Sequence, residues 1–221
     1  MSATQQGNGK KLVFVGDSGV GKTCIITRFL KGTFDSNQLT TDGASYATKT
    51  IEIKEMNEYI TFDIWDTAGQ ERYRSLTKFF FQGAKIAILV YDITRKETFD
   101  NLKNEWYKQI KEHGDEDVIL GIAGNKSDLY DEEAVSEQEA RDFAKSIGAV
   151  FSLTSAQNNS GIEDFFRNLA RRYLGIDTTT DATGGNKPKP KQEQKPGNDN
   201  TIKIDSKNAT KKKDEKKKGF C

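Results

Sequence analysis

The amino-acid sequence predicts an α/β fold, with a six-stranded, mostly parallel sheet, one antiparallel edge strand and about five helices on its two faces. Short apolar runs alternate along the chain with amphipathic stretches, as in β-α-β units. The runs are continuously apolar and do not alternate with polar residues, which indicates strands that are buried on both faces. The five runs occupy residues 12–15, 60–65, 86–91, 118–123 and 150–153.

Local motifs predict the remaining elements. Residues 49–66 are typical of a hairpin, which supplies the antiparallel edge strand. Residues 136–139 and 160–163 both have the Ser-x-x-Glu spacing of a capping box, and Gly175 lies where a helix that ends near residue 174 needs a C-terminal glycine. One buried helix face is indicated by apolar residues that recur every three or four positions, namely Phe99, Leu102, Trp106 and Ile110.

Composition divides the 221 residues into a folded body and two flexible ends. All three prolines lie beyond residue 175, in a stretch with almost no apolar residues, which cannot bury enough surface to offset the entropy of ordering. We therefore expect a flexible lead at 1–9, one domain at 10–174 and a disordered tail at 175–221. The tail carries 12 Lys against 7 Asp and Glu, whereas the body is acidic, so we expect the tail to contact an anionic surface.

The chain has only two cysteines, Cys24 just inside a predicted helix and Cys221 at the last position, so a disulfide framework is not expected. This usage favours a reducing, cytosolic compartment. The sequence also has no apolar run of ~18 residues and no signal-peptide pattern at its start. We therefore expect a protein that works on the cytosolic side.

A phosphate-binding loop follows the first apolar run. Residues 16–23 read Gly-Asp-Ser-Gly-Val-Gly-Lys-Thr, a full G-x(4)-G-K-T match. Glycines let the backbone wrap around a phosphate, Lys22 reaches the β and γ oxygens, and the Thr23 hydroxyl coordinates Mg²⁺. The alternative, a glycine turn before a helix, is disfavoured by the strand–turn–helix context. The loop predicts a nucleoside triphosphatase but does not specify the base.

A guanine-specific pattern follows the later strands. Residues 125–128 read Asn-Lys-Ser-Asp, and the Asp128 carboxylate can accept hydrogen bonds from N1–H and N2–H₂ of guanine, which adenine cannot supply. The stem of Lys126 and the ring of Phe34 can cover the two faces of the base, and the backbone N–H of Ala156 can donate to O6. A polar turn with a solvated Asp is the alternative. Together with the phosphate loop, the pattern argues against an ATP-using enzyme.

With the segment Asp-Thr-Ala-Gly-Gln-Glu at 66–71, these motifs resemble those of the Ras superfamily of small GTPases, and within it the Rab family. The Rab likeness is carried by Trp-Asp-Thr-Ala-Gly-Gln-Glu-Arg-Tyr at 65–73 and Tyr-Asp-Ile-Thr at 91–94. The resemblance covers residues 10–174 and implies a P-loop NTPase fold.

The resemblance also implies roles for single residues. Gln70 would orient the attacking water and act with Lys22 and Thr41 in catalysis, while Thr23, Thr41 and Asp66 would hold Mg²⁺, Asp66 through a water. The residues that it implies in binding GTP or GDP are Asp17, Ser18, Gly19, Val20, Gly21, Lys22, Thr23, Cys24, Phe34, Thr41, Asp66, Gly69, Asn125, Lys126, Asp128, Leu129, Ser155, Ala156 and Gln157.

The effector surface of the family is implied by three aromatic residues, Tyr46, Trp65 and Phe80, although packing in the core would also explain them.

Two positions depart from the family pattern. Asp42 stands where the first switch usually has an apolar residue, and we hypothesise that it narrows the choice of partner; drift on an exposed loop is the alternative. Gln157 replaces a usual Lys, with little expected effect because the Ala156 backbone reads the base.

The function implied is a switch that binds GTP, hydrolyses it slowly and cycles between GDP and GTP states to recruit effectors to membranes in vesicle traffic. Implied partners are a guanine-nucleotide exchange factor, a GTPase-activating protein, a GDP-dissociation inhibitor or escort protein, and Rab effectors. Neither nucleic acid nor a second copy of the chain is expected to bind. A nucleotide-locked scaffold with little hydrolysis remains an alternative, against which Gln70 and Thr41 argue.

The end of the tail resembles the prenylated end of Rab proteins. Lysine runs at 211–213 and 216–218 precede Cys221, the last residue, which is a single cysteine and is not in a C-a-a-X box. An unmodified tail with a chance cysteine is the alternative. Lipidation would place the protein on the cytosolic face of an intracellular membrane, endosomal or another vesicle membrane, in exchange with the cytosol. The first switch looks somewhat like that of endocytic Rabs.

Overall fold

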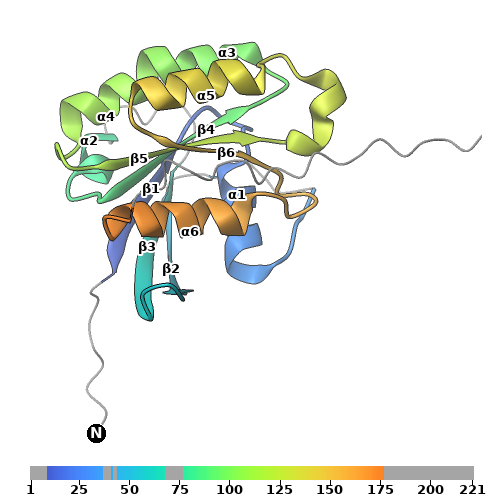
Figure 1. Cartoon of the computed structure of the whole chain (residues 1–221). Coiled ribbons are helices and arrows are strands. Elements are labelled where there is room, and N and C mark those ends of the chain that lie inside the picture. Colours follow the sequence, from blue (N-terminus) through green and yellow to red (C-terminus); the bar gives the residue numbers. More distant parts are fainter. Residues whose placement is uncertain (1–8, 37–40, 42–43, 68–76, 177–221) are drawn as a thin grey trace, which may run out of the picture. The chain divides into compact units, whose positions relative to one another are not determined.

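The computed structural model describes residues 9–36, 41, 44–67 and 77–176, and these residues contain one six-stranded sheet (Figure 1). All neighbouring strands are parallel except β2 and β3, which are antiparallel, so the predicted fold class is confirmed. In sheet order the strands are β2 (Ala44–Ile53), β3 (Glu58–Thr67), β1 (Lys10–Val15), β4 (Ile86–Asp92), β5 (Ile119–Asn125) and β6 (Val150–Thr154).

Six α-helices lie in the described part, where the sequence predicted about five. A π-helical segment, η2 (Leu102–Trp106), continues α3 into α4, and a 3₁₀ segment, η3 (Ser127–Glu132), follows β5. The apolar repeat predicted for one helix face runs through α3, η2 and α4, and its four residues are all buried. The α-helices are α1 (Lys22–Lys31), α2 (Thr77–Phe81), α3 (Lys96–Asn101), α4 (Tyr107–His113), α5 (Glu137–Ser146) and α6 (Ile162–Tyr173).

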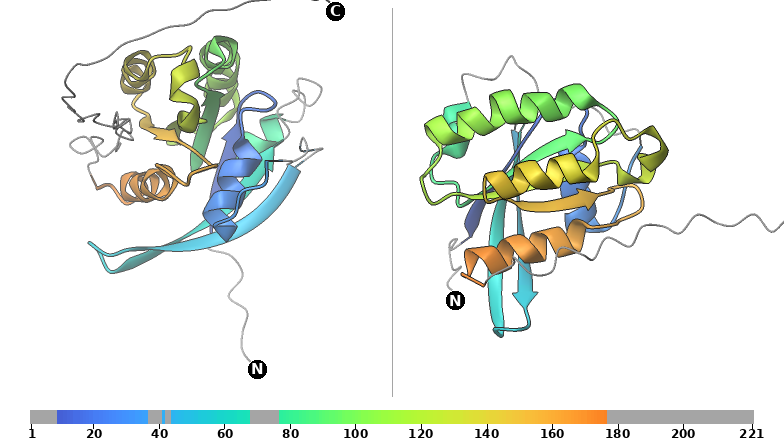
Figure 2. Two further views of the ribbon diagram at one scale, coloured as in Figure 1. Left: turned by 90° about the vertical axis from the view of Figure 1, so that its right-hand side faces the viewer. Right: turned by 45° about the horizontal axis from the view of Figure 1, so that its top comes forward.

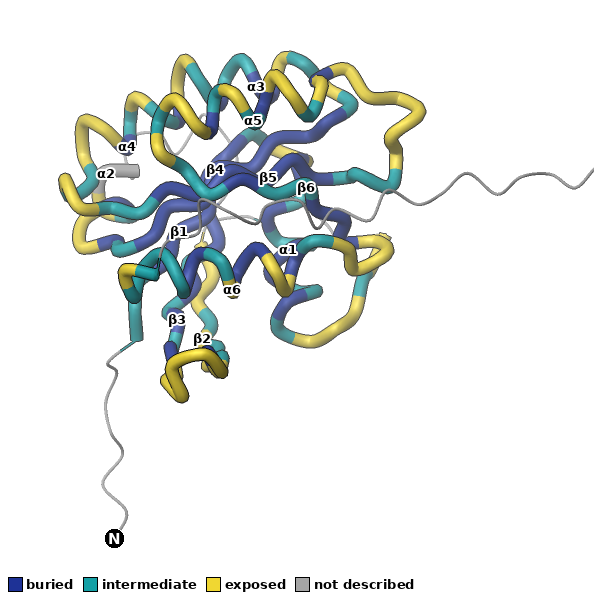
Figure 3. The backbone as a smooth tube through the Cα atoms, in the orientation of Figure 1, coloured by how far each residue is buried: buried dark blue, intermediate teal, exposed yellow. Residues whose placement is uncertain are grey.

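Helices cover both faces of the sheet. Helices α1 and α6 pack on one face, where the rings of Phe29 and Phe166 stack with their centroids 3.6 Å apart. The α3–η2–α4 segment and α5 pack on the other face around Phe99 and Tyr91. Strands β1 and β4 are buried along most of their length (Figure 3), as their continuous apolar runs predict.

The predicted hairpin is present, and its turn at 54–57 extends past the helices (Figure 2). Asn57 has a φ of 52°, which suits a tight turn, and an ion pair between Glu55 and Arg171 ties the turn to α6. No helix in the described part is both long enough and apolar enough to cross a membrane. The described strands and helices run from Lys10 to Tyr173, and the predicted ends at 1–9 and 175–221 stay predictions.

Of the two predicted capping boxes, the first is confirmed as an N-cap at Ser136 and the second is wrong. The Glu139 N–H donates to Ser136 Oγ at the start of α5. Helix α6 begins instead after Gly161, which has a φ of +72° and makes no side-chain cap, while Ser160 pairs with Ser155 in an isolated bridge. A Cβ on Gly161 would lie 2.1 Å from the Leu153 carbonyl oxygen, so packing against β6 dictates this helix start.

The end of α6 follows the prediction. Gly175 has a φ of +74°, and the N–H groups of Gly175 and Ile176 donate to the carbonyls of Arg172 and Arg171. This is the hydrogen-bond pattern of a Schellman motif. The glycine therefore ends the helix as its position in the sequence predicts.

Candidate functional site

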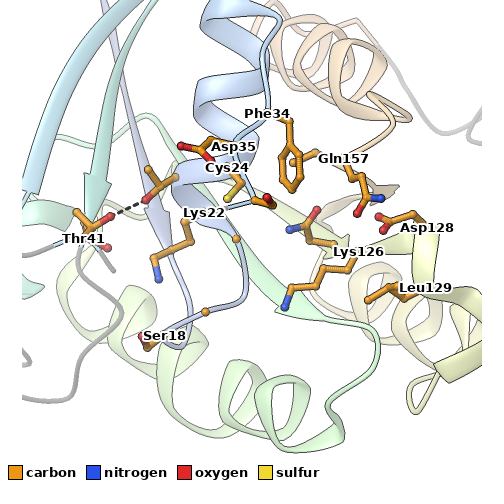
Figure 4. Close-up of a pocket in the computed structure, with 17 residues that line it drawn as sticks. Ser18, Lys22, Cys24, Phe34, Asp35, Thr41, Lys126, Asp128, Leu129 and Gln157 are labelled. Atoms are coloured by element: carbon orange, nitrogen blue, oxygen red, sulfur yellow. Dashed lines mark hydrogen bonds between the residues drawn. The ribbon is translucent and has the colours of Figure 1, made fainter. Parts of the chain in front are cut away.

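A cavity of about 330 Å³ lies at the carboxyl ends of the parallel strands, where ligands bind in sheets of this kind. Its walls are the phosphate loop at 16–23, the loop after α1, Thr41, and the loops after β5 and β6 (Figure 4). The structure therefore brings separately predicted motifs to one place. The predicted site residues that line the cavity are Ser18, Gly19, Gly21, Lys22, Thr23, Cys24, Phe34, Thr41, Asn125, Lys126, Asp128, Leu129, Ala156 and Gln157.

Four predicted residues lie behind the cavity wall. Val20 is buried in the core, Asp66 accepts a hydrogen bond from Thr23, Ser155 bonds to Asp128, and the Asp17 side chain contacts the α3–η2 segment. These residues support the wall and do not form it. Four further predictions fall outside the described residues, namely Asp42, Gly69, Gln70 and Cys221.

The phosphate loop is tight because its glycines adopt backbone angles closed to other residues. Gly16 has a φ of +142°, and a Cβ there would lie 2.2 Å from the Val90 carbonyl oxygen. Gly21 has a φ of +96°, and its Cβ would lie 2.2 Å from Nδ2 of Asn125. A side chain at Gly16 would force the loop away from β4, and one at Gly21 would displace the Asn125 amide. The loop is thus held close around one end of the cavity.

Lys22 is a buried cation inside this loop. Its side chain is 6% exposed, and its Nζ donates to the carbonyl oxygens of Gly16 at 2.7 Å and Asp17 at 3.0 Å. Burial lowers the pKa of Lys22 to about 8, while the negative charges of Asp66 and Asp17 act in the opposite direction. An anion that entered the loop would stabilise the charged form, so this end of the cavity suits phosphate.

Three oxygen-bearing side chains meet beside Lys22. The Thr23 hydroxyl donates to Asp66 Oδ2 at 2.6 Å, and its Oγ1 lies 2.6 Å from Oγ1 of Thr41. Asp66 is 2% exposed, and its Oδ1 is buried without a hydrogen-bond partner. Burial raises the pKa of Asp66, against the opposing hydrogen bond from Thr23 and the charge of Lys22. Hard oxygen donors with one unsatisfied carboxylate oxygen fit a small divalent cation such as Mg²⁺.

The opposite end of the cavity is lined by Asp128, Gln157 and Phe34, which gather away from Lys22 and Thr41 in Figure 4. The buried Ser155 hydroxyl donates to the Asp128 carboxylate and so fixes its position. This end combines a carboxylate acceptor with an aromatic face, as a planar base that carries N–H donors requires.

Arg28 and Asn125 hold the base-side loops in place. From α1, Arg28 donates to the carbonyl oxygens of Ala156 at 2.7 Å and Gln157 at 2.9 Å. The buried Asn125 amide donates to the Val20 carbonyl oxygen at 2.8 Å in the phosphate loop. Asn125 therefore connects the phosphate end of the cavity to the base end.

The sequence prediction missed several residues of the site. Asp35, Ser36 and Thr67 line the cavity, and Thr67 also donates to the Phe14 carbonyl oxygen at 2.6 Å. Thr67 follows Asp66 in the quoted motif, so its position could have been included. Arg28 bonds to residues 128 and 129 positions away, and no local pattern predicts such a contact.

The three aromatic residues predicted as an effector surface form one cluster. The ring centroids of Tyr46 and Trp65 lie 5.4 Å apart, and those of Trp65 and Phe80 lie 6.5 Å apart. Tyr46 is 56% exposed, and the other two are half-buried. The rings therefore pack against one another and remain accessible, and their use as an effector surface stays a prediction.

Comparison with known proteins gives a consistent result. The model of the Ras family matches residues 11–175. The chain is 45% identical over 174 residues to human Ras-related protein Rab-22A and 43% identical over 175 residues to human Ras-related protein Rab-31, covering 79% of this chain and 88% of either relative. It is 38% identical over 201 residues to Ras-related protein RGP2 of rice, covering 89% of this chain and 88% of that protein.

Proposed function

This chain belongs to the Ras family of small GTPases and is of Rab type, and from that premise we propose that the cavity described above binds GTP and GDP. The protein hydrolyses GTP and acts as a Rab-type switch in vesicle traffic. One observation carries the assignment of the site: Lys22 and Asp128, a phosphate-binding cation and a guanine-reading carboxylate, line the same cavity.

At the phosphate end, Lys22 and the backbone N–H groups of the loop bind the β- and γ-phosphates. Thr23, Thr41 and Asp66 would hold Mg²⁺, and the unpartnered Oδ1 of Asp66 supports this role. When bound, Mg²⁺ neutralises charge on the β- and γ-phosphate oxygens. In the GTP state Thr41 would contact the γ-phosphate as well as the metal and so order the first switch, and loss of the γ-phosphate would release it.

At the base end, Asp128 accepts from N1–H and N2–H₂ of guanine, and Ser155 keeps the carboxylate in place. The stem of Lys126 and the ring of Phe34 cover the faces of the base, and the Ala156 N–H donates to O6. Adenine supplies no N–H donors at these two positions, so ATP should bind much more weakly than GTP.

We assign hydrolysis to Gln70, which orients the attacking water, together with Lys22 and Thr41. Among the described residues no arginine lines the cavity. Intrinsic turnover should therefore be slow, on the order of 10⁻⁴ to 10⁻³ per second, as it is for Ras. An activating protein would supply the missing arginine and raise the rate.

Replacing Gln70 with leucine should lower single-turnover GTP hydrolysis in the presence of an activating protein by about 100-fold, because the attacking water loses its orienting group. Release of phosphate from preloaded protein measures the rate. Gln138→Leu is the control, since Gln138 is exposed on α5. Equally slow hydrolysis by the parent and by Gln70→Leu, with the activating protein present, would instead favour a nucleotide-locked scaffold.

We propose that partners and membrane are contacted by separate parts of the chain. The cluster of Tyr46, Trp65 and Phe80 is the surface for effectors, together with Asp42, which shortly precedes Tyr46 in the sequence. An exchange factor and a GDP-dissociation inhibitor or escort protein complete the cycle. Six lysines within 211–218 and a lipid on Cys221 hold the protein on the cytosolic face of an intracellular membrane, endosomal or another vesicle membrane.

Substitution of Cys221 by serine should remove most of the membrane-bound fraction, because stable anchoring takes a lipid together with a basic segment, and Asp214 and Glu215 weaken the attraction of the lysines. Fractionation of cells that express the tagged full chain measures the effect. Asn208→Ser is the control, because it makes a similar change in the tail and keeps the thiol. A Cys221→Ser protein that remains with membranes as the parent does would contradict lipid anchoring.

A further inference from the structure

An acidic side chain is an unexpected part of a phosphate loop. Asp17 is the second residue of the loop, and a carboxylate beside bound phosphates is unfavourable unless its charge is turned away and compensated. The structure meets both conditions. The Asp17 side chain does not line the cavity, and two N–H groups donate to its carboxylate. Trp106 Nε1 donates to Asp17 Oδ1 at 2.8 Å, and Asn101 Nδ2 donates to Asp17 Oδ2 at 2.8 Å.

The π-helical segment explains how both donors reach one carboxylate. Asn101 ends α3 and Trp106 ends η2, five positions further on. In a regular α-helix two residues five positions apart point about 140° away from each other. In η2 the Tyr107 N–H bonds to the Leu102 carbonyl oxygen five residues back, which is the π-helical pattern that stacks such positions. The wider turn therefore brings Asn101 and Trp106 to the same side.

The clamped residue is part of the phosphate-binding machinery. The backbone carbonyl oxygen of Asp17 accepts from Lys22 Nζ at 3.0 Å. Through its carbonyl and its carboxylate, Asp17 therefore connects the loop cation to the α3–η2 segment. The next residue is held from the same region, because Arg95 Nη2 donates to the Ser18 carbonyl oxygen at 3.2 Å. Trp106 is only 6% exposed, so its hydrogen bond to Asp17 is partly shielded from water.

We propose that Asn101 and Trp106 are positioning residues that clamp the Asp17 carboxylate, hold the phosphate loop in its binding shape and so slow nucleotide release. This inference rests on the proposed function of the loop. Without the clamp, the loop samples shapes in which its N–H groups and Lys22 no longer converge on the phosphates, and GDP leaves faster. Asn101 and Trp106 make no hydrogen bond to the described residues at the guanine end of the cavity, so the ratio of the affinities for GDP and IDP should change much less than the release rate.

Asn101→Asp tests the clamp, because it places two carboxylates at hydrogen-bonding distance. We expect release of a fluorescent GDP from the full chain with Mg²⁺ to be about tenfold faster or more, the loss expected when hydrogen bonds to a charged group are broken. Adding Asp17→Asn restores a carboxylate–amide pair with its polarity reversed and should return the rate to within about threefold of the parent. Asn104→Asp makes the same change at an exposed position of the same helix and should have no effect.

Trp106→Phe gives an independent test if Asn101→Asp does not fold. It keeps an aromatic ring in the core, removes the N–H donor and should also accelerate release. The chain has two tryptophans, so nuclear magnetic resonance can follow each indole N–H; Asp17→Asn should shift the Trp106 signal and leave that of Trp65 in place. Parent-like GDP release by folded Asn101→Asp or Trp106→Phe would overturn the clamp, whereas a parent that bound no GDP would overturn the proposed function.

Discussion

Replacing Lys22 with methionine is expected to lower the affinity for both GTP and GDP by about 10²- to 10⁴-fold, the loss that follows when one partner of a buried ion pair is removed. Lys22 is buried at the mouth of a loop whose backbone N–H groups also bind phosphate, so no other side chain of the loop can replace its charge. Methionine has a similar length and keeps the side chain's packing. Equilibrium titration with a fluorescent nucleotide measures the loss.

Lys31→Met is the matched control, because Lys31 is the exposed last residue of the same helix α1. Its affinity should equal that of the parent. The thermal unfolding temperature without nucleotide shows whether Lys22→Met is folded. If the folded variant bound nucleotide with the parent's affinity, Lys22 would not contribute to phosphate binding.

Asp128→Asn is expected to reverse the choice of base. Asparagine presents an N–H₂ group where the carboxylate accepts from guanine, so GTP loses its partner and should bind about 10²-fold or more weakly. Xanthine carries an oxygen in place of the guanine N2–H₂ group and can accept from the new amide, so the affinity for xanthosine triphosphate should rise. The ratio of the two affinities measures the reversal.

A second asparagine variant controls for the removal of one negative charge. Asp131 is exposed in the same 3₁₀ segment and does not line the cavity, so Asp131→Asn should keep the preference for GTP. If Asp128→Asn also kept that preference, the carboxylate would not read guanine. The hydrogen bond that Asp128 accepts from Ser155 would then be structural only.

The sequence predicted the parts of this protein that depend on local chemistry. The buried strands appear as continuous apolar runs because both of their faces are covered, and the motifs follow those runs because parallel strands end at one edge of the sheet. Gly175 and Ser136 acted as predicted because helix ends are decided by neighbouring residues. These features need no knowledge of the tertiary structure.

The rest depends on contacts between distant positions. Ser160 failed as a cap because Gly161 must lie against Leu153, a constraint that the Ser-x-x-Glu spacing does not contain. The hydrogen bonds that Asp17 accepts from Asn101 and Trp106 span 84 and 89 positions. The π-helical turn that brings these two donors together has the same apolar repeat in the sequence as an α-helix, so the sequence does not predict it.

The buried amide of Asn125 has a consequence for how the site opens. It donates to the phosphate loop at Val20, and its Oδ1 lies 3.3 Å from the Thr154 hydroxyl at the end of β6. A local unfolding event that frees one of these loops must leave buried polar atoms of the other unpaired. The two halves of the cavity therefore form one cooperative unit, and a fragment that fills either half should preorganise the other for its own ligand.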